Sequence, residues 1–79
     1  MSTSLADLEP EERFELVDVP DGDTRARLLR LGFFDGEVTC RHHIRSGPVI
    51  VRRNGTELAL GSSLAKQIEV ERLSSTGGE

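Results

Sequence analysis

The dipeptide Asn54-Gly55 is the feature that most restricts how this chain can fold. It separates two runs of residues that favour β-strands, 48–53 and 56–60. A two-residue hairpin loop of type I′ needs positive φ at both residues, and asparagine and glycine accept that conformation most readily. The sequence therefore predicts two antiparallel strands joined directly at Asn54-Gly55.

Three other segments are predicted to be strands. Residues 13–19 alternate in polarity with an ambiguous inner face, residues 37–44 alternate with one mostly apolar face, and residues 69–73 form the last run. On the second of these segments, the apolar face holds Val38, Cys40, His42 and Ile44, and the other face holds Thr39, Arg41, His43 and Arg45.

An amphipathic helix of about three turns is predicted for residues 24–31, ended by Gly32 in the left-handed conformation. A short helical turn is expected before the last strand. The candidate N-caps are Asp21 or Asp23 for the helix and Ser62 or Ser63 for the short turn. Near the N-terminus, Ser4 can cap one further turn.

These elements predict a mainly β fold with the helix between the first and second strands. The chain has 79 residues, which is enough for one small domain. Five short strands are too few for a two-layer sandwich, so closure into a small, partly open barrel is the economical way to cover the strand edges. We expect residues 1–73 to form the domain and residues 74–79 to be a disordered tail.

Composition narrows the environment and the chemistry. A single cysteine allows no internal disulfide, and no apolar run reaches the roughly 18–20 residues of a membrane span. The N-terminus also lacks the basic-then-apolar pattern of a signal peptide. We therefore expect a cytoplasmic protein without membrane insertion. No motif of a catalytic triad, phosphate loop or zinc protease is present, so neither an enzyme nor a cofactor is predicted.

Charge is distributed unevenly, although the formal net charge is only −4. Residues 1–24 contain eight acidic residues and one arginine, whereas residues 25–53 contain seven arginines and two acidic residues. These charges either pair locally on the surface or form a basic face for an acidic partner.

An ordered set of residues resembles the FeoA family. The matching positions are Leu5, Leu8, Leu28, Leu31, Gly32, Gly36, Val38, Gly47, Pro48, Gly55, Leu58, Leu60, Ile68 and Val70. The chain departs from the family pattern where Glu11 or Glu12 replaces a usual glycine and Asp35 replaces a usual proline. The resemblance covers about residues 4–72 and implies a small SH3-like five-stranded barrel.

The resemblance also implies a function. FeoA-like proteins are non-catalytic accessory proteins of bacterial ferrous iron uptake, and they are thought to bind and regulate the cytoplasmic G-protein part of a FeoB-type transporter. Two alternatives remain at this stage. One is a protein-interaction domain related to the appended domain of iron-dependent repressors, and the other is a small-barrel module that binds nucleic acid.

The predicted partner-binding surface is the helix and its exit. Large apolar side chains are too dense there for one helix side to bury, and Phe33 and Phe34 are adjacent. One of the two phenylalanines is expected on the surface as an anchor, unless the turn folds over and buries both. The candidate residues are Leu28, Leu29, Leu31, Phe33 and Phe34, rimmed by Arg25, Arg27 and Arg30. The sequence leaves weak homo-oligomerisation open.

A metal site and a nucleic-acid surface are less favoured by the sequence. On a regular strand Cys40 and His42 share a face and lie about 6.6–7 Å apart, but a closed zinc site needs two more ligands. Cys40 is therefore expected to be a small core residue, with His42 at the barrel rim and His43 in solvent. A basic patch on neighbouring strands would contain Arg41, Arg45, Arg52 and Arg53, but no aromatic residue is interleaved with these arginines.

Overall fold

The structure is a computed structural model that describes residues 3–44 and 47–73. The predicted disordered tail and Arg45 lie outside the described residues. Along the chain the elements are β1 (Thr3–Ser4), η1 (Leu5–Asp7), β2 (Arg13–Asp18), α1 (Asp23–Arg30), β3 (Val38–His43), β4 (Val49–Arg53), β5 (Thr56–Leu60), α2 (Ser62–Ala65) and β6 (Glu69–Arg72).

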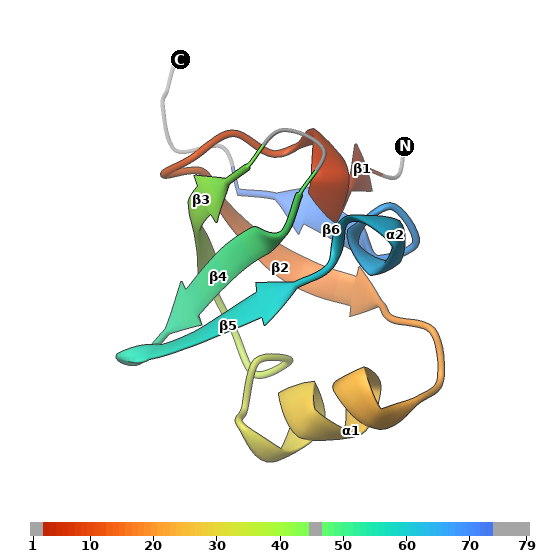
Figure 1. Ribbon diagram of the computed structural model, residues 1–79. Helices are drawn as coiled ribbons and strands as arrows, with labels where there is room; N and C mark the ends of the chain where they lie inside the picture. Colours follow the sequence, from red (N-terminus) through yellow and green to blue (C-terminus); the bar gives the residue numbers. More distant parts are fainter. Residues whose placement is uncertain (1–2, 45–46, 74–79) are drawn as a thin grey trace.

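The strands form one antiparallel sheet that curls into a small SH3-like barrel, as predicted (Figure 1). The order is β1-β6-β2-β3-β4-β5. The strand count of five was wrong, because Thr3 and Ser4 pair with Val70 and Glu69 and add β1 to the sheet. α1 lies at the end of the barrel that is opposite to β1 and to the C-terminal end of β3 (Figure 1).

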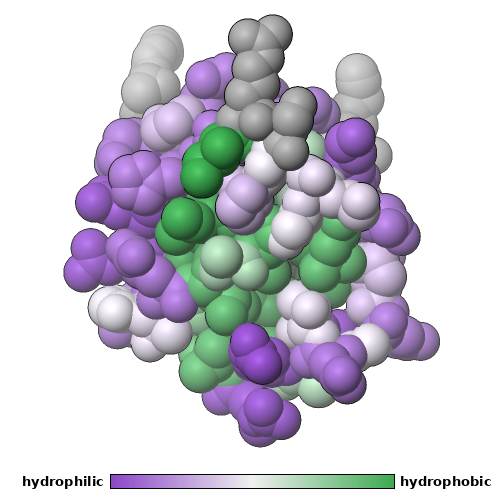
Figure 2. Space-filling model, viewed as in Figure 1, coloured by the Kyte–Doolittle hydropathy of each residue, from purple (hydrophilic) through white to green (hydrophobic). Residues whose placement is uncertain are grey.

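The core is almost entirely aliphatic, with two phenylalanines. Its buried members are Leu5, Leu8, Phe14, Val19, Leu28, Phe33, Val38, Cys40, Val49, Val51, Leu60, Ala65, Ile68 and Val70. They come from every element except β1. The helices α1 and α2 and the N-terminal segment 5–8 are therefore attached to the same core. On the face shown in Figure 2, apolar side chains gather over β4 and β5 and towards α1, inside a hydrophilic periphery.

The hairpin between β4 and β5 confirms the prediction made from Asn54-Gly55. Asn54 has a φ of 52° and Gly55 a φ of 84°. Arg53 faces Thr56 directly across the two-residue loop. Both central residues thus have the positive φ that a type I′ turn requires.

The end of α1 is a Schellman motif. The N–H of Phe33 donates to the carbonyl of Leu28 at 2.9 Å, and the N–H of Gly32 donates to that of Leu29 at 3.2 Å. Gly32 has a φ of +80°, which a side chain would disfavour. Leu28 and Phe33, the hydrophobic pair of this motif, are both fully buried.

The start of α1 differs from the prediction. The helix has eight residues rather than about three turns, and its N-cap is Gly22, with no side-chain hydrogen bond. Asp23 is instead the first helical residue, where its carboxylate lies near the positive end of the helix dipole. The N-cap of α2 is likewise a glycine, Gly61, rather than one of the two predicted serines. The predicted cap at Ser4 is confirmed, since its side chain accepts the N–H of Ala6 at 3.1 Å.

A bulge in β2 explains its ambiguous alternation. The register with β6 shifts between Leu16 and Asp18. Phe14 before the shift and Val19 after it are both buried, whereas Val17 is 52% exposed. The extra residue lets two positions of opposite parity point inward, which a strict two-residue period does not allow.

A candidate partner-binding surface on α1

α1 separates the predicted interaction residues into two groups. Leu28 and Phe33 belong to the core and have no exposed surface, so they cannot contact a partner directly. Leu29 and Leu31 are 50% and 43% exposed. The reason is geometric: Leu28 lies on the side of the two-turn helix that faces the barrel, and Leu29 is rotated by about 100° from it.

Phe34, three residues after Leu31, has intermediate exposure. It is partly buried and packs against the core, next to the fully buried Phe33. The guanidinium carbon of Arg25 lies 5.7 Å from the centre of the Phe34 ring. This distance and placement fit a cation–π contact between the two side chains.

The arginines of α1 have no acidic partner within the part of the chain that the structure describes. The ion pairs found there involve Arg13, Arg41 and Arg72. Arg25, Arg27 and Arg30 follow one another along α1, where Asp23 is the one acidic residue of the helix. We call Leu29, Leu31, Phe34, Arg25, Arg27 and Arg30 the α1 surface. It combines exposed apolar groups with positive charge.

The strand with the cysteine and histidines contains a second bulge, which overturns the predicted faces. Cys40 is opposite Val51, but His42 is opposite Ile50 and His43 is opposite Val49, so the register shifts between Cys40 and His42. Val49 and Val51 are buried on the inner side of the sheet. His43 therefore shares the side of Cys40, and His42 lies on the outer side. The prediction that Cys40 and His42 share a face is wrong.

Cys40 is a core residue, as the sequence predicted. It has no exposed surface, and burial raises the pKa of its thiol from 9.0 to about 11, with smaller contributions from the negative charges of Glu12, Glu11 and Glu9. A thiol with a raised pKa is protonated at neutral pH and is a poor metal ligand. In the described ranges 3–44 and 47–73, no three His, Cys, Asp or Glu side chains come together as a metal site.

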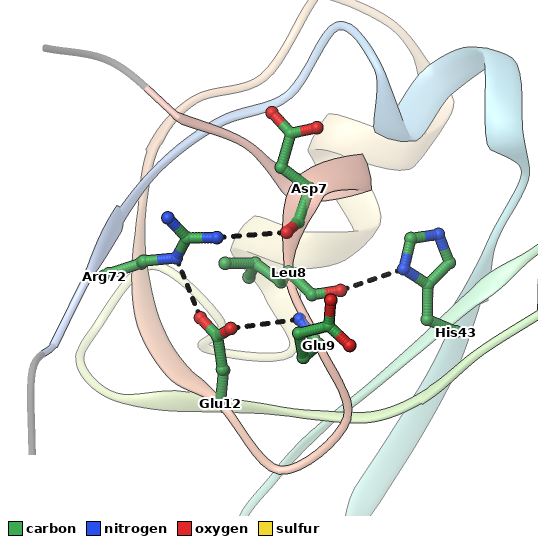
Figure 3. A network of polar contacts seen from close by, with 6 residues as sticks. All are labelled: Asp7, Leu8, Glu9, Glu12, His43 and Arg72. Atoms are coloured by element: carbon green, nitrogen blue, oxygen red, sulfur yellow. Dashed lines mark hydrogen bonds and ion pairs between the residues drawn. The ribbon is translucent and has the colours of Figure 1, made fainter. Parts of the chain in front are cut away.

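His43 is not in open solvent but helps to hold the N-terminal segment that contains Leu8. Its Nδ1 lies 2.9 Å from the carbonyl oxygen of Leu8, which can only accept, so Nδ1 carries the proton (Figure 3). Arg72 holds the same segment from the other side. It donates to Glu12 Oε1 at 2.8 Å and to the carbonyl of Asp7 at 3.0 Å. Leu8 is thereby kept in the core between β3 and β6.

The predicted basic patch on β3 and β4 does not form as expected among its described members. Arg41 is 3.2 Å from a carboxylate oxygen of Glu11. Arg53 turns towards the connection between α1 and β3 and donates to the carbonyls of Gly32 and Glu37. Of the three described arginines of this patch, Arg41, Arg52 and Arg53, only Arg52 is exposed and forms no ion pair. Most of the positive charge of this patch is therefore used within the fold.

Comparison with known proteins agrees with this architecture. The model of the FeoA domain matches residues 3–72. The chain belongs to the FeoA family. Curated proteins, by contrast, include no significant match to it. Among the described residues, no helix is long and apolar enough to cross a membrane.

Solved structures of FeoA proteins share the fold. The crystal structure of an iron uptake regulatory protein (FeoA) has a TM-score of 0.73 and 25% identity, covering 92% of this chain and 100% of its own. The NMR structure of the FeoA protein from Chlorobium tepidum has a TM-score of 0.79 and 26% identity, covering 96% of this chain and 75% of its own. A FeoA-like protein from Clostridium acetobutylicum, 23% identical, supports the fold with a TM-score of 0.70 over 99% of this chain and 94% of its own.

Glu11 is one of the two positions that can match the usual glycine of the FeoA pattern, and its backbone conformation explains why glycine is favoured there. Glu11 has a φ of 75°, in the left-handed region where glycine is favoured. Glu9 to Glu12 form a turn closed by a 3.1 Å hydrogen bond, with Pro10 in the second position and Glu11 in the third. That third position requires positive φ in a type II turn. Of the two candidate positions, Glu11 is therefore the one at which the usual glycine has a conformational reason.

Sequence reasoning missed two roles of polar side chains. Arg53 was assigned to a basic patch and His43 to solvent, yet both bind backbone carbonyls in distant segments. No local signal in the sequence indicates these contacts, because the partners are 21 and 35 positions away. Gly36 is the one residue in the sequence whose type relates to the Arg53 contact. A Cβ there would lie 3.0 Å from the Arg53 guanidinium.

Proposed function

We propose that this FeoA-family protein is a non-catalytic, cytoplasmic accessory protein of ferrous iron uptake. It binds the cytoplasmic G-protein part of a FeoB-type transporter and regulates it. The family match over residues 3–72 supports this proposal, as does the similarity to a FeoA protein that is described as an iron uptake regulatory protein.

The α1 surface is the proposed docking site, and its composition is the observation that carries the proposal. Leu29 and Leu31 expose about half of their surface, and Phe34, three residues after Leu31, has Arg25 over its ring. Isolated exposed leucines are ordinary, but these two lie within five positions of Phe34, an aromatic residue that is only partly buried. Central apolar anchors inside a charged rim are typical of protein interfaces.

The charge of the α1 surface indicates the chemistry of its partner. Arg25, Arg27 and Arg30 have no acidic partner among the described residues, so a docking segment that presents carboxylates can satisfy them. Ion pairs at the rim of an interface mainly accelerate association and are screened by salt. Binding through this surface should therefore weaken as the ionic strength rises.

Charge substitutions at the exposed leucines test the docking site. Leu29→Glu and Leu31→Glu should each weaken binding to the purified cytoplasmic domain of the transporter by at least tenfold, since each places an acid where apolar burial is needed. Calorimetric titration measures the affinity. Both positions are exposed, so thermal unfolding should change little.

Ile44→Glu is the matched control. Ile44 is 53% exposed but directly follows β3, at the barrel end away from α1 (Figure 1). Its substitution should leave the affinity unchanged. If the Leu29 and Leu31 variants bind like the wild-type protein, or if Ile44→Glu weakens binding equally, α1 is not the docking surface.

A further inference from the structure

We infer that Arg53 is a positioning residue that holds the connection between α1 and β3, and with it the α1 surface, in its place on the barrel. The role assigned to the α1 surface rests on the proposed function, whereas the contacts of Arg53 do not. Arg53 is the last residue of β4, directly before the hairpin loop. Its side chain reaches the connection that follows α1 and leads into β3.

Two hydrogen bonds from one guanidinium bracket this connection. Nε of Arg53 donates to the carbonyl of Gly32 at 2.8 Å, and Nη1 donates to the carbonyl of Glu37 at 2.9 Å. Gly32 is the residue that ends α1, and Glu37 directly precedes β3. The fork of a guanidinium can bind two carbonyls in fixed geometry, which an ammonium group cannot do. Arg53 therefore ties both ends of the connection to the hairpin.

Gly36 makes room for this contact. A Cβ at position 36 would lie 3.0 Å from Nη1 and 3.2 Å from Nη2 of Arg53. The φ of Gly36 is not in the positive region, so the backbone itself does not demand glycine there. The absence of a side chain is instead what lets the guanidinium lie against the connection.

Few other polar contacts hold α1 in place. In the part of the chain that the structure describes, no hydrogen bond joins the residues of α1 to a strand, and the helix is attached through the buried side chains of Leu28 and Phe33. Apolar contacts are not directional, so they anchor the helix without fixing its orientation closely. Phe34 lies inside the connection that Arg53 holds, so the same two hydrogen bonds place part of the α1 surface. Keeping a binding surface in its bound arrangement lowers the entropic cost of association.

Amide hydrogen exchange tests the positioning role without any partner. In Arg53→Met, exchange should accelerate by about tenfold or more at two amides of the connection, that of Phe33, which donates to Leu28 of α1, and that of Asp35, which donates to Gly32. Exchange at Cys40, whose amide donates to Glu12 in the sheet, should not change. Arg53→Lys should behave like Arg53→Met, because an ammonium group keeps the charge but cannot bind both carbonyls in the fixed geometry of a guanidinium. Equal acceleration at all three amides, or none, overturns the inference.

Arg52→Met is the matched control, since Arg52 is the preceding residue, is exposed and forms no ion pair within the described residues. It should leave all three exchange rates unchanged. Gly36→Ala places a methyl group against the Arg53 guanidinium and should therefore reproduce part of the faster exchange seen in Arg53→Met. In the double variant with Arg53→Met, Gly36→Ala should cause no further acceleration of amide exchange. Full additivity of the two substitutions contradicts a shared contact.

The transporter domain supplies the functional readout. Arg53→Met should weaken its binding by about tenfold while Arg52→Met does not, because the α1 surface is then no longer preorganised. Unchanged affinity alongside faster local exchange removes the link between Arg53 and docking. If even the wild-type protein does not bind the domain, the proposed function fails, and the exchange data still decide whether Arg53 holds the connection.

Discussion

Replacing Glu11 with glycine should relieve backbone strain in this protein, although it removes an ion pair. Glu11 has a φ of 75°, and its N–H donates to the carbonyl of Cys40 while the Cys40 N–H donates to the carbonyl of Glu12. Two consecutive residues thus oppose one residue of β3, with the first in the left-handed conformation. This is the arrangement of a bulge whose first residue is usually glycine.

The expected gain is a difference between opposing terms. A residue with a side chain in the left-handed region costs about 1–2 kcal/mol. Glycine removes that cost but makes the unfolded chain more flexible, which offsets about 0.4–1 kcal/mol. The pair between Glu11 and Arg41, at 3.2 Å, involves a Glu11 side chain that is 68% exposed. Such pairs contribute only about 0.2–1 kcal/mol. We therefore expect Glu11→Gly to be more stable than Glu11→Ala, which lacks the same pair, by about 0.5–1 kcal/mol.

Thermal and denaturant unfolding followed by circular dichroism measure this difference. For a domain of this size, 1 kcal/mol corresponds to about 4–8 °C in the melting temperature. Glu9→Gly is the control, since Glu9 is in the same turn but has no positive φ, and glycine there should destabilise the fold. If Glu11→Gly melts at or below the temperature of Glu11→Ala, the left-handed residue is not strained and the reasoning is refuted.

Two further predictions concern the core. Because the folded thiol of Cys40 has a pKa near 11 rather than 9.0, the folded state keeps a proton that the unfolded state loses in this range. This thiol should have no effect on stability below pH 9, and it should lower the free energy of unfolding by about 2–3 kcal/mol as the pH rises to 11. Denaturant titrations should show a smaller fall over this range for Cys40→Ala. Identical pH profiles for the two proteins contradict the burial argument. Leu28→Ala should cost about 2–5 kcal/mol of unfolding free energy, whereas Leu29→Ala on the exposed side should cost well under half of that; equal losses would show that both leucines are packed alike.

Local signals predicted those parts of the fold whose physical causes are local. The turn at Asn54-Gly55 and the helix end at Gly32 depend on φ values that few residues adopt, so the sequence alone indicates them. The cap at Ser4 also has a local cause, a hydrogen bond to a residue two positions along the chain.

The bulges in β2 and β3 were not predictable from alternation. A bulge shifts the register by one residue and moves every later side chain to the other face. This shift placed His42 outside and His43 inside, and it removed the proposed pairing of Cys40 with His42. The signal for a bulge lies in the pairing between strands, not within either strand.

The sequence by itself determined the fold class, the positions of the main turns and the presence of an arginine-rich helix with more leucines than it can bury. Only the tertiary structure decided which of them remain outside. Leu28 and Phe33 enter the core, while Leu29 and Leu31 stay exposed, because a helix of two turns offers one side to the barrel. The structure also decided that Arg53 serves the fold rather than a surface patch, since its carbonyl partners become neighbours only when β4 pairs with β3.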